Sequence, residues 1–351
     1  MTATARRLID IKEVSRMLAA RIVTLAPELL PKGARAGHEW VLDEKGGDKI
    51  SVHLSGGLAG VWKHWNGTGK GDALDLVAYV LFGEDKKKAL EWSLRWLGLE
   101  SGDPRALETV RRATPAPEAI DAEAAKAIET ARNNARRIWL AAEPRVRGTP
   151  VDTYLTGRGI DLAELHRQPG AIRYHPSLWN KESERKWPAM VTAVTGPVPG
   201  GWMACHRTWL EIQRDGRVTK APLKDAKMTL GSFKGGHISL WRGASDKPLR
   251  DAEAGETVDL TEGIENGLSV ALCAPELRVL AAVTMGNLPH VVLPEAVTTI
   301  RVWKDNDVKP SAIAAFDRAL RGLLTGGRTI LIAQMPKGIK DVNDLLQANN
   351  E

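Results

Sequence analysis

Residues 257–263 read Thr-Val-Asp-Leu-Thr-Glu-Gly, a strand-like run that ends in an acidic residue and a glycine. Further strand-like and helical runs alternate after it. The strand-like runs are residues 278–283, 298–303 and 329–333, and the helical runs are residues 266–272 and 312–324. Strands that alternate with helices form parallel sheets with right-handed crossover connections. We therefore expect residues 253–351 to form an α/β domain whose parallel sheet carries helices on both faces.

Acidic residues follow three of these strands, at the edge where parallel sheets bind their ligands. Glu262 follows the first strand, and Asp305 and Asp307 follow the third. Because side chains alternate along an extended segment, Asp305 and Asp307 are expected to project to the same side. Asp341 and Asp344 follow the fourth strand. We predict that these acids, distant in sequence, meet at one edge of the sheet.

Converging carboxylates repel one another, and they stay ionised easily when a hard cation such as Mg²⁺ or Mn²⁺ lies among them. Oxygen ligands alone disfavour zinc. A cation held in this way can bridge phosphate oxygens, activate a hydroxyl and stabilise a leaving pyrophosphate. Because Asp-x-Asp alone is common in turns, the prediction of a metal site depends on the combination of acidic segments.

Three segments of this part of the chain together resemble the Toprim fold, which DnaG-type primases, topoisomerases, some nucleases and recombination proteins share. They are residues 258–263, 305–307 and 340–346. The resemblance implies that Glu262, Asp305 and Asp307 are catalytic and bind metal, with Glu262 as a metal-linked residue or general base. It implies that Asp341 is a further metal-linked acid. Asp344 stays open, because it could instead cap the last helix.

The preceding residues, 150–252, alternate short apolar runs with turns, which predicts a small, largely antiparallel sheet. Residues 200–210 within them resemble the basic core that precedes the Toprim domain in DnaG-type primases. That resemblance implies that Arg207 and Lys227, with Arg158 behind them, contact the template and the incoming nucleotide.

Lys220 and Lys224 extend this predicted basic surface. With Lys227 and Lys234 they fall within fifteen residues of one another, and they could form either a phosphate-facing ridge or a solvated loop. The charge of the chain is split in the same sense. Residues 253–351 hold 9 Lys or Arg against 13 Asp or Glu, which gives them a net charge of −4. Because the whole chain has a formal charge of +6, residues 1–252 carry +10. A basic surface of this kind can follow a phosphate backbone.

The first hundred residues resemble the zinc-binding domain of the same primases, with a ribbon, turn and helix at residues 62–76. His64 and Gly67 stand where paired cysteines are expected, and glycine cannot bind zinc. We therefore predict a zinc-ribbon-like unit without structural zinc at residues 1–100. Residues 101–149 are predicted to form a proline-containing linker followed by a helix rich in alanine and arginine.

Several classes of protein are disfavoured by the sequence. It contains no run of about 18 apolar residues and no charged start followed by an apolar block, so neither a membrane span nor a secretory signal is predicted. Two cysteines do not build a disulfide framework, which fits a cytoplasmic protein. The phosphate-loop spacing is missing, so a helicase motor, if one is used, is expected on a separate polypeptide.

Three functions remain open at this point. The resemblance favours a primase of phage or plasmid type that synthesises short primers on single-stranded DNA from nucleoside triphosphates. A metal-dependent nuclease of the same fold is the first alternative, although a topoisomerase would need a nucleophilic tyrosine in an additional domain. The second alternative is a non-catalytic accessory protein of replication that binds single-stranded DNA.

Overall fold

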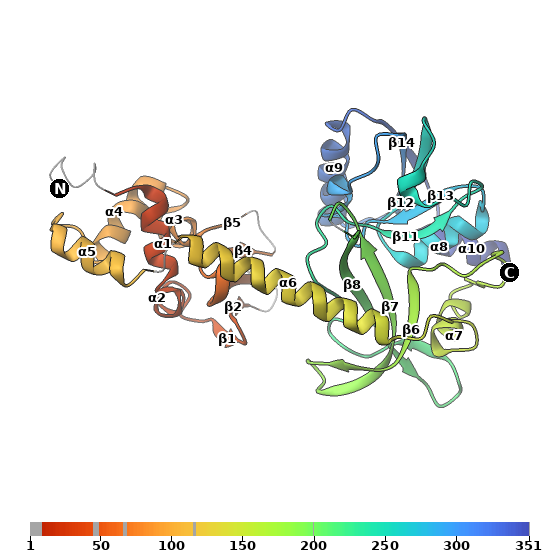
Figure 1. Cartoon of the computed structure of the whole chain (residues 1–351), viewed down its shortest axis with the longest axis horizontal. Coiled ribbons are helices and arrows are strands. Elements are labelled where there is room, and N and C mark those ends of the chain that lie inside the picture. Colours follow the sequence, from red (N-terminus) through yellow and green to blue (C-terminus); the bar gives the residue numbers. More distant parts are fainter. Residues whose placement is uncertain (1–8, 45–48, 66–68, 115–116, 199, 351) are drawn as a thin grey trace. The chain divides into compact units, whose positions relative to one another are not determined.

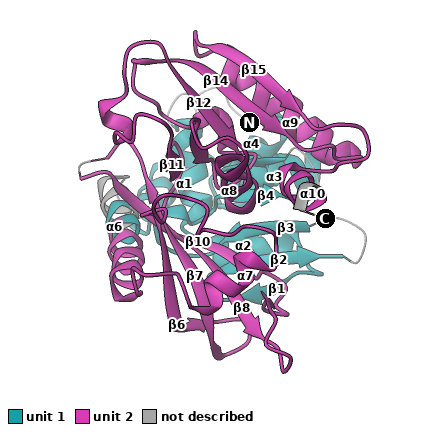
Figure 2. Ribbon diagram, turned by 90° about the vertical axis from the view of Figure 1, so that its right-hand side faces the viewer, with its two compact units in different colours: residues 1–128 teal, residues 129–351 magenta. Residues whose placement is uncertain are grey.

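The computed structural model describes residues 9–44, 49–65, 69–114, 117–198 and 200–350. The chain divides into two compact units, residues 1–128 and 129–351 (Figure 1, Figure 2). Helix α6 (Pro117–Ala141) contains the division between them. The finer division into segments 1–100, 101–149, 150–252 and 253–351 stays a prediction.

Unit 1 combines a small antiparallel sheet with helices. Its strands are β1 (Ala34–Ala36), β2 (Glu39–Asp43), β3 (Lys49–His53), β4 (Trp62–His64) and β5 (Lys70–Gly71), and they pair in chain order. Its helices are α1 (Ile11–Ala19), α2 (Ile22–Leu29), α3 (Ala73–Phe82), α4 (Lys86–Trp96) and α5 (Pro104–Arg112). Apolar side chains from α1, α2 and α3 form its core with β3 and β4.

Capping residues fix the starts of two of these helices. Asp72 accepts hydrogen bonds from the backbone N–H groups of Leu74 and Asp75, and Asp75 completes a capping box at the start of α3. Asp103 accepts a hydrogen bond from the Arg105 N–H, with Pro104 at the first position of α5. Helix α5 corrects the prediction of a linker over residues 101–120, since the proline that indicated a linker instead begins a helix.

Unit 2 contains two sheets. The first is antiparallel, with order β10-β8-β7-β6 and a short β9 that also pairs with β8. Its strands are β6 (Ile172–Asn180), β7 (Arg185–Thr195), β8 (Trp202–Ile212), β9 (Val218–Lys220) and β10 (Lys227–Leu230). Helix α7 (Pro150–Thr156) precedes them. The predicted antiparallel sheet is therefore present.

The second sheet has the order β11-β13-β12-β14-β15. Its strands are β11 (Ile238–Arg242), β12 (Glu256–Thr261), β13 (Arg278–Ala281), β14 (Val297–Lys304) and β15 (Thr329–Gln334). Strands β12 to β15 pair in parallel, whereas β11 pairs antiparallel with β13. The predicted parallel sheet is confirmed, and an edge strand from the preceding segment extends it.

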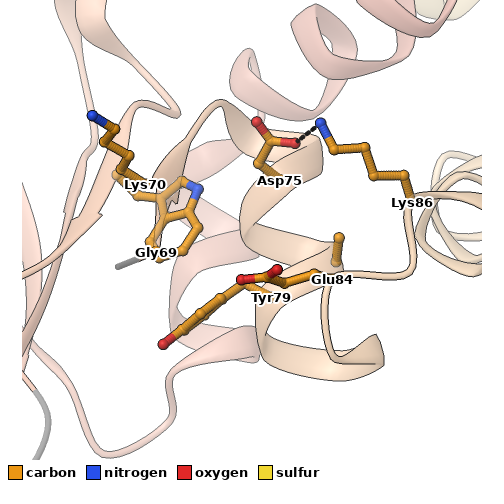
Figure 3. Close-up of a pocket in the computed structure, with 8 residues that line it drawn as sticks. Gly69, Lys70, Asp75, Tyr79, Glu84 and Lys86 are labelled. Atoms are coloured by element: carbon orange, nitrogen blue, oxygen red, sulfur yellow. Dashed lines mark ion pairs between the residues drawn. The ribbon is translucent and has the colours of Figure 1, made fainter. Parts of the chain in front are cut away.

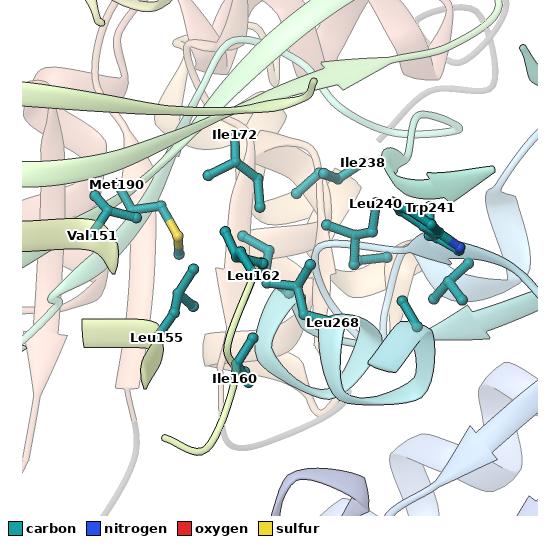
Figure 4. Close-up of a cluster of buried hydrophobic side chains, with 14 of the residues drawn as sticks. Val151, Leu155, Ile160, Leu162, Ile172, Met190, Ile238, Leu240, Trp241 and Leu268 are labelled. Atoms are coloured by element: carbon teal, nitrogen blue, oxygen red, sulfur yellow. The ribbon is translucent and has the colours of Figure 1, made fainter. Parts of the chain in front are cut away.

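Helices cover both faces of this sheet, as predicted (Figure 1). Helix α9 (Pro310–Leu324) packs on one face, where Phe316 and Leu323 meet apolar side chains of β12 and β14. Helices α8 (Ile264–Cys273) and α10 (Val342–Asn350) lie in the core on the other side. That core is continuous with β6, β7 and α7: Leu268 of α8 shares it with Ile172 and Met190 (Figure 4). The two sheets therefore belong to one compact unit.

A buried carboxylate lies in the centre of the parallel sheet. Asp259 of β12 is fully buried, and its carboxylate accepts hydrogen bonds from Trp303 Nε1 at 2.7 Å and Arg301 Nη1 at 3.1 Å. Burial raises the pKa of Asp259, while the bonds to Trp303 and Arg301 counteract that rise. Arg301 and Trp303 both come from β14, so this cluster joins the two central strands.

Among the helices of the described residues, none combines the length and the apolar character needed to cross a bilayer.

Candidate active site

The predicted acidic residues lie at the carboxyl edge of the parallel sheet. Glu262 follows β12 directly, and Asp305 and Asp307 follow β14. Asp341 precedes α10, where its carboxylate accepts a hydrogen bond from the Asp344 N–H at 3.0 Å. The helix-capping role left open for Asp344 therefore falls to Asp341 instead.

Asn306 brings the segment before α10 to the end of β14. Its backbone N–H donates to the Lys340 carbonyl at 2.7 Å, and its side-chain amide donates to the carbonyls of Met335, Pro336 and Ile339. The side chain of Asn306 is thus used in holding the chain together. This contact explains how Asp341, 36 positions after Asp305, comes close enough to affect its charge.

The pKa of Asp305 records this convergence. Burial, followed by the negative charges of Asp341, Glu262 and Asp307, raises it to about 7. The amide of Asn266, in the first turns of α8, donates to Asp305 Oδ1 at 3.0 Å. The four predicted acids therefore share one electrostatic environment.

Glu262 is held by a strained loop. Its Oε1 atom accepts a hydrogen bond from the Met285 N–H at 3.1 Å, just beyond β13. Val283, two residues earlier, has φ 76°, a left-handed conformation that β-branched residues rarely adopt. Such strain persists where the surrounding structure enforces it, and it clusters at functional sites.

A cavity of about 290 Å³ adjoins the acidic residues of β14. Its polar lining includes Asp305, Asp307 and Lys304, whose ammonium lies 5.1 Å from the ring of Phe316. Its apolar lining includes Phe316 and Met285. The cavity thus combines charge with an apolar wall, as small-molecule sites commonly do.

The donor set fits a hard cation. The acidic residues offer carboxylate oxygens, which Mg²⁺ and Mn²⁺ prefer, and the concentrated negative charge that raises the pKa of Asp305 is what a divalent cation relieves. In the part of the chain that the structure describes, no group of three or more His, Cys, Asp or Glu side chains is arranged to hold a metal ion. Mutual repulsion opposes a closer approach of these carboxylates.

The raised pKa of Asp305 predicts how the stability of the protein depends on pH. The pKa of about 7 in the folded state lies above the value of about 3.9 in an unfolded chain. Ionising Asp305 therefore destabilises the folded state, by an amount that is absent below pH 4 and grows as the pH rises to 7. Asp305→Asn should therefore stabilise the metal-free protein at pH 8 by about 1–2 kcal/mol, after allowing for partial solvent exposure. At pH 4 the variant and the wild type should be equal. Urea unfolding with a chelator at both pH values checks this, and a less stable variant at pH 8 would contradict it.

Three of the predicted basic residues lie around a buried carboxylate that the sequence analysis did not select. Glu265 of α8 is 6% exposed. Its Oε1 and Oε2 atoms lie 2.8 Å and 2.9 Å from Lys227 Nζ, and its Oε1 lies 3.7 Å from Lys220 Nζ and accepts a hydrogen bond from Tyr154 at 2.8 Å. Arg158 is close enough for its charge to lower the pKa of Lys220. We call Arg158, Lys220, Lys227 and Glu265 the basic cluster.

Arg207 and Lys224 are not brought into the basic cluster. Lys227 pairs with Thr208, so Arg207, the next residue of β8, projects from the opposite face of the sheet. There its guanidinium lies 4.9 Å from the Trp209 ring, and burial lowers its pKa. Lys224 lies exposed in the β9–β10 connection, and its backbone N–H donates to Glu182. Arg207 and Lys227 therefore face opposite sides of the sheet, because neighbouring residues of a strand alternate, and the contacts of both with template and nucleotide stay predictions.

Unit 1 has its own pocket, of about 240 Å³ (Figure 3). Trp62 and Tyr79 lie with their ring centroids 4.7 Å apart, and a Cβ atom at Gly69 would come within 2.7 Å of both rings. Lys86 forms an ion pair with Asp75 at 2.8 Å on the same pocket. The glycine in the predicted turn at residues 66–71 is thus required by close packing on the rings; residues 66–68 lie outside the described residues.

Family models match two segments of unit 2. Residues 257–351 match a model described as the Toprim domain. The C-terminal domain is a Toprim domain. Residues 129–240 match a model described as a domain of unknown function, DUF7146. The resemblance expected from Glu262, Asp305 and the segment before α10 is confirmed.

Other comparisons are more distant. The chain aligns with the crystal structure of the Aquifex aeolicus primase zinc-binding and RNA polymerase domains at 16% identity and a TM-score of 0.38, over 99% of this chain and 83% of that one. It aligns with the primase fragment of the bacteriophage T7 primase-helicase protein at 16% identity and a TM-score of 0.35, over 56% of this chain and 69% of that one. No curated protein matches.

Proposed function

We propose that the protein is a DNA primase that joins nucleotides on a single-stranded DNA template with Mg²⁺ or Mn²⁺. The observation that supports the proposal is that the charges of Asp341, Glu262 and Asp307 raise the pKa of Asp305 at the carboxyl edge of the parallel sheet, where such sheets bind ligands. Nucleoside triphosphates and single-stranded DNA are the proposed ligands, and a helicase on another polypeptide is a proposed partner.

The basic cluster supports a nucleotide as substrate. Glu262 lies two residues before α8 and Glu265 lies in its first turn, so only two residues of sequence separate the acidic residues from the basic cluster. A triphosphate has oxygens for a divalent cation and further negative charge for ammonium groups. The net charge of the basic cluster is about +2, because three cations surround one carboxylate.

In the proposed mechanism, Asp305 and Asp307 would hold the cation, with Glu262 and Asp341 beside them. The bound cation supplies charge neutralisation at the reacting phosphate and lowers the pKa of the attacking hydroxyl. Glu262, which the Met285 N–H holds, would accept the proton of a primer 3′-hydroxyl. Lys220 and Lys227 would orient the triphosphate, so that catalysis comes mostly from positioning and electrostatic stabilisation.

Primer synthesis on a panel of single-stranded templates tests this function. The protein, given labelled nucleoside triphosphates and Mg²⁺ or Mn²⁺, should join them into short products on these templates. In a parallel experiment, labelled single-stranded DNA incubated with metal and without nucleotides reports cleavage. Cleavage without synthesis would assign the site to a nuclease, and DNA binding that ignores both metal and nucleotide would assign the protein to a binding role.

A further inference from the structure

The basic cluster is built around a charge that no ligand can reach easily. Glu265 is buried, and it accepts hydrogen bonds from Tyr154 and Lys227 while facing Lys220. Lys220 and Lys227 keep 39% and 35% of their side chains exposed. The Glu265 carboxylate therefore lies in the interior of the cluster, and a ligand in solvent would reach the side chains of Lys220 and Lys227.

A hydrogen-bond chain fixes the position of Glu265. The Ser269 hydroxyl donates to the Glu265 carbonyl, and the Asn343 amide donates to Ser269 Oγ at 3.1 Å. Asn343 Oδ1 in turn accepts a hydrogen bond from Arg158 Nη2 at 2.7 Å. Helices α8 and α10 thus hold both the central carboxylate and the third cation of the cluster.

Glu265 counteracts the effects that lower the pKa of Lys220. Burial lowers the pKa of Lys220, and the nearby charges of Lys227 and Arg158 lower it further. Glu265 is the group that opposes these effects. Burial would raise the pKa of Glu265 itself, but Lys227, Lys220 and the Tyr154 hydroxyl outweigh it and hold it near 2.

We propose that Glu265 is a positioning residue that keeps the ammonium groups of Lys220 and Lys227 side by side as a binding site for the polyphosphate chain of a nucleoside triphosphate. The nature of this ligand rests on the proposed function. Six titratable or charged groups make up or face the cluster. They are Tyr154 of α7, Arg158 just after α7, His206 of β8, Lys220 of β9, Lys227 of β10 and Glu265 of α8.

His206, which also faces the basic cluster, does not change its charge between pH 6 and pH 9. It is buried, and burial together with the charge of Lys227 lowers its pKa to about 4. It is therefore neutral across the range in which a lysine loses its proton. Tyr154, whose pKa is raised by burial and by Glu265, also stays neutral there.

The test measures binding of inorganic tripolyphosphate to the full chain by calorimetry, without metal or template, from pH 6 to pH 9. At pH 6 Glu265→Gln should bind as tightly as the wild type or more tightly, because it removes a negative charge beside the cations. As the pH rises to 9 the variant should lose affinity relative to the wild type, by about tenfold at pH 9, because burial lowers the pKa of Lys220 and Glu265 no longer opposes that effect. The ratio of the two Kd values cancels the titration of the probe.

Two further variants sharpen the test. Lys220→Arg in the Glu265→Gln background should restore a ratio that does not change with pH, because a guanidinium keeps its proton. Glu276→Gln removes the same charge at an exposed position before β13, and its ratio should stay at one. A pH-independent ratio for folded Glu265→Gln would overturn the proposal.

If circular dichroism shows that Glu265→Gln does not fold, Lys220→Gln gives an independent answer. It should bind tripolyphosphate about tenfold more weakly at pH 7, where the wild type uses the charge of Lys220. Wild-type affinity in that variant overturns the proposal, as does a wild-type protein that does not bind tripolyphosphate. Because these measurements use neither metal nor template, a failure of primer synthesis alone would reject the proposed function and leave this inference standing.

Discussion

Replacing Asp305 and Asp307 together by asparagine is expected to reduce nucleotide incorporation about a thousandfold or more, because the substrate loses the charge stabilisation that dominates phosphoryl transfer. Asparagine keeps the size and most hydrogen bonds of aspartate. The side chain at position 305 still offers an oxygen to the Asn266 amide in that variant. The fold should therefore remain, and the loss should appear in catalysis.

The matched control is Asp317→Asn, an exposed aspartate of α9. It changes the net charge without touching the acidic residues at the sheet edge, and its incorporation rate should equal that of the wild type. Binding of single-stranded DNA without metal should be retained in both variants. Incorporation by the double variant within about tenfold of the wild type would contradict the assigned catalytic roles.

The largest expected effect on stability belongs to Arg301→Ala. This change leaves the carboxylate of Asp259 fully buried in β12 without its cationic partner, and breaking a buried pair in this way should cost about 3 kcal/mol. The hydrogen bond from Trp303 remains, so part of the pairing survives. Urea unfolding at pH 7 measures the difference in the free energy of unfolding.

A second change should recover much of this loss. Asp259→Asn combined with Arg301→Ala leaves a neutral side chain that still accepts a hydrogen bond from Trp303, so no uncompensated charge is buried. The double variant is expected to be more stable than Arg301→Ala. A double variant that is less stable than Arg301→Ala would show that Arg301 acts by packing and not by charge.

The alternation of strands and helices was sufficient to predict the parallel sheet, because short runs rich in apolar and β-branched residues alternate with helical runs. The acidic residues could be placed for the same reason: Glu262, Asp305 and Asp307 follow strand ends, and parallel strands end at a common edge. The hydrogen bonds of the Asn306 amide, which bring the segment with Asp341 to these acidic residues, could not be predicted. Its three carbonyl partners lie about thirty residues away and have no sequence signature.

The basic residues show the opposite case. Arg207 and Lys227 were selected together through the resemblance to primases. The register of β8 and β10 decides which face each of them occupies, and the sequence does not reveal that register. Glu265 was missed because the predicted helix began at residue 266, whereas α8 begins at Ile264. A glutamate beside buried apolar positions of a helix was the available signal. The left-handed backbone of Val283 gave none.

The most direct test of the account is the binding of Mn²⁺, measured by electron paramagnetic resonance, to the wild-type chain and to the Asp305→Asn, Asp307→Asn double variant. The account predicts that Mn²⁺ binds to the wild type and binds at least about a hundredfold more weakly to the variant. Losing a residue that binds the metal directly costs more affinity than losing a residue that only orients such a ligand. Equal Mn²⁺ affinity in the two proteins would contradict it.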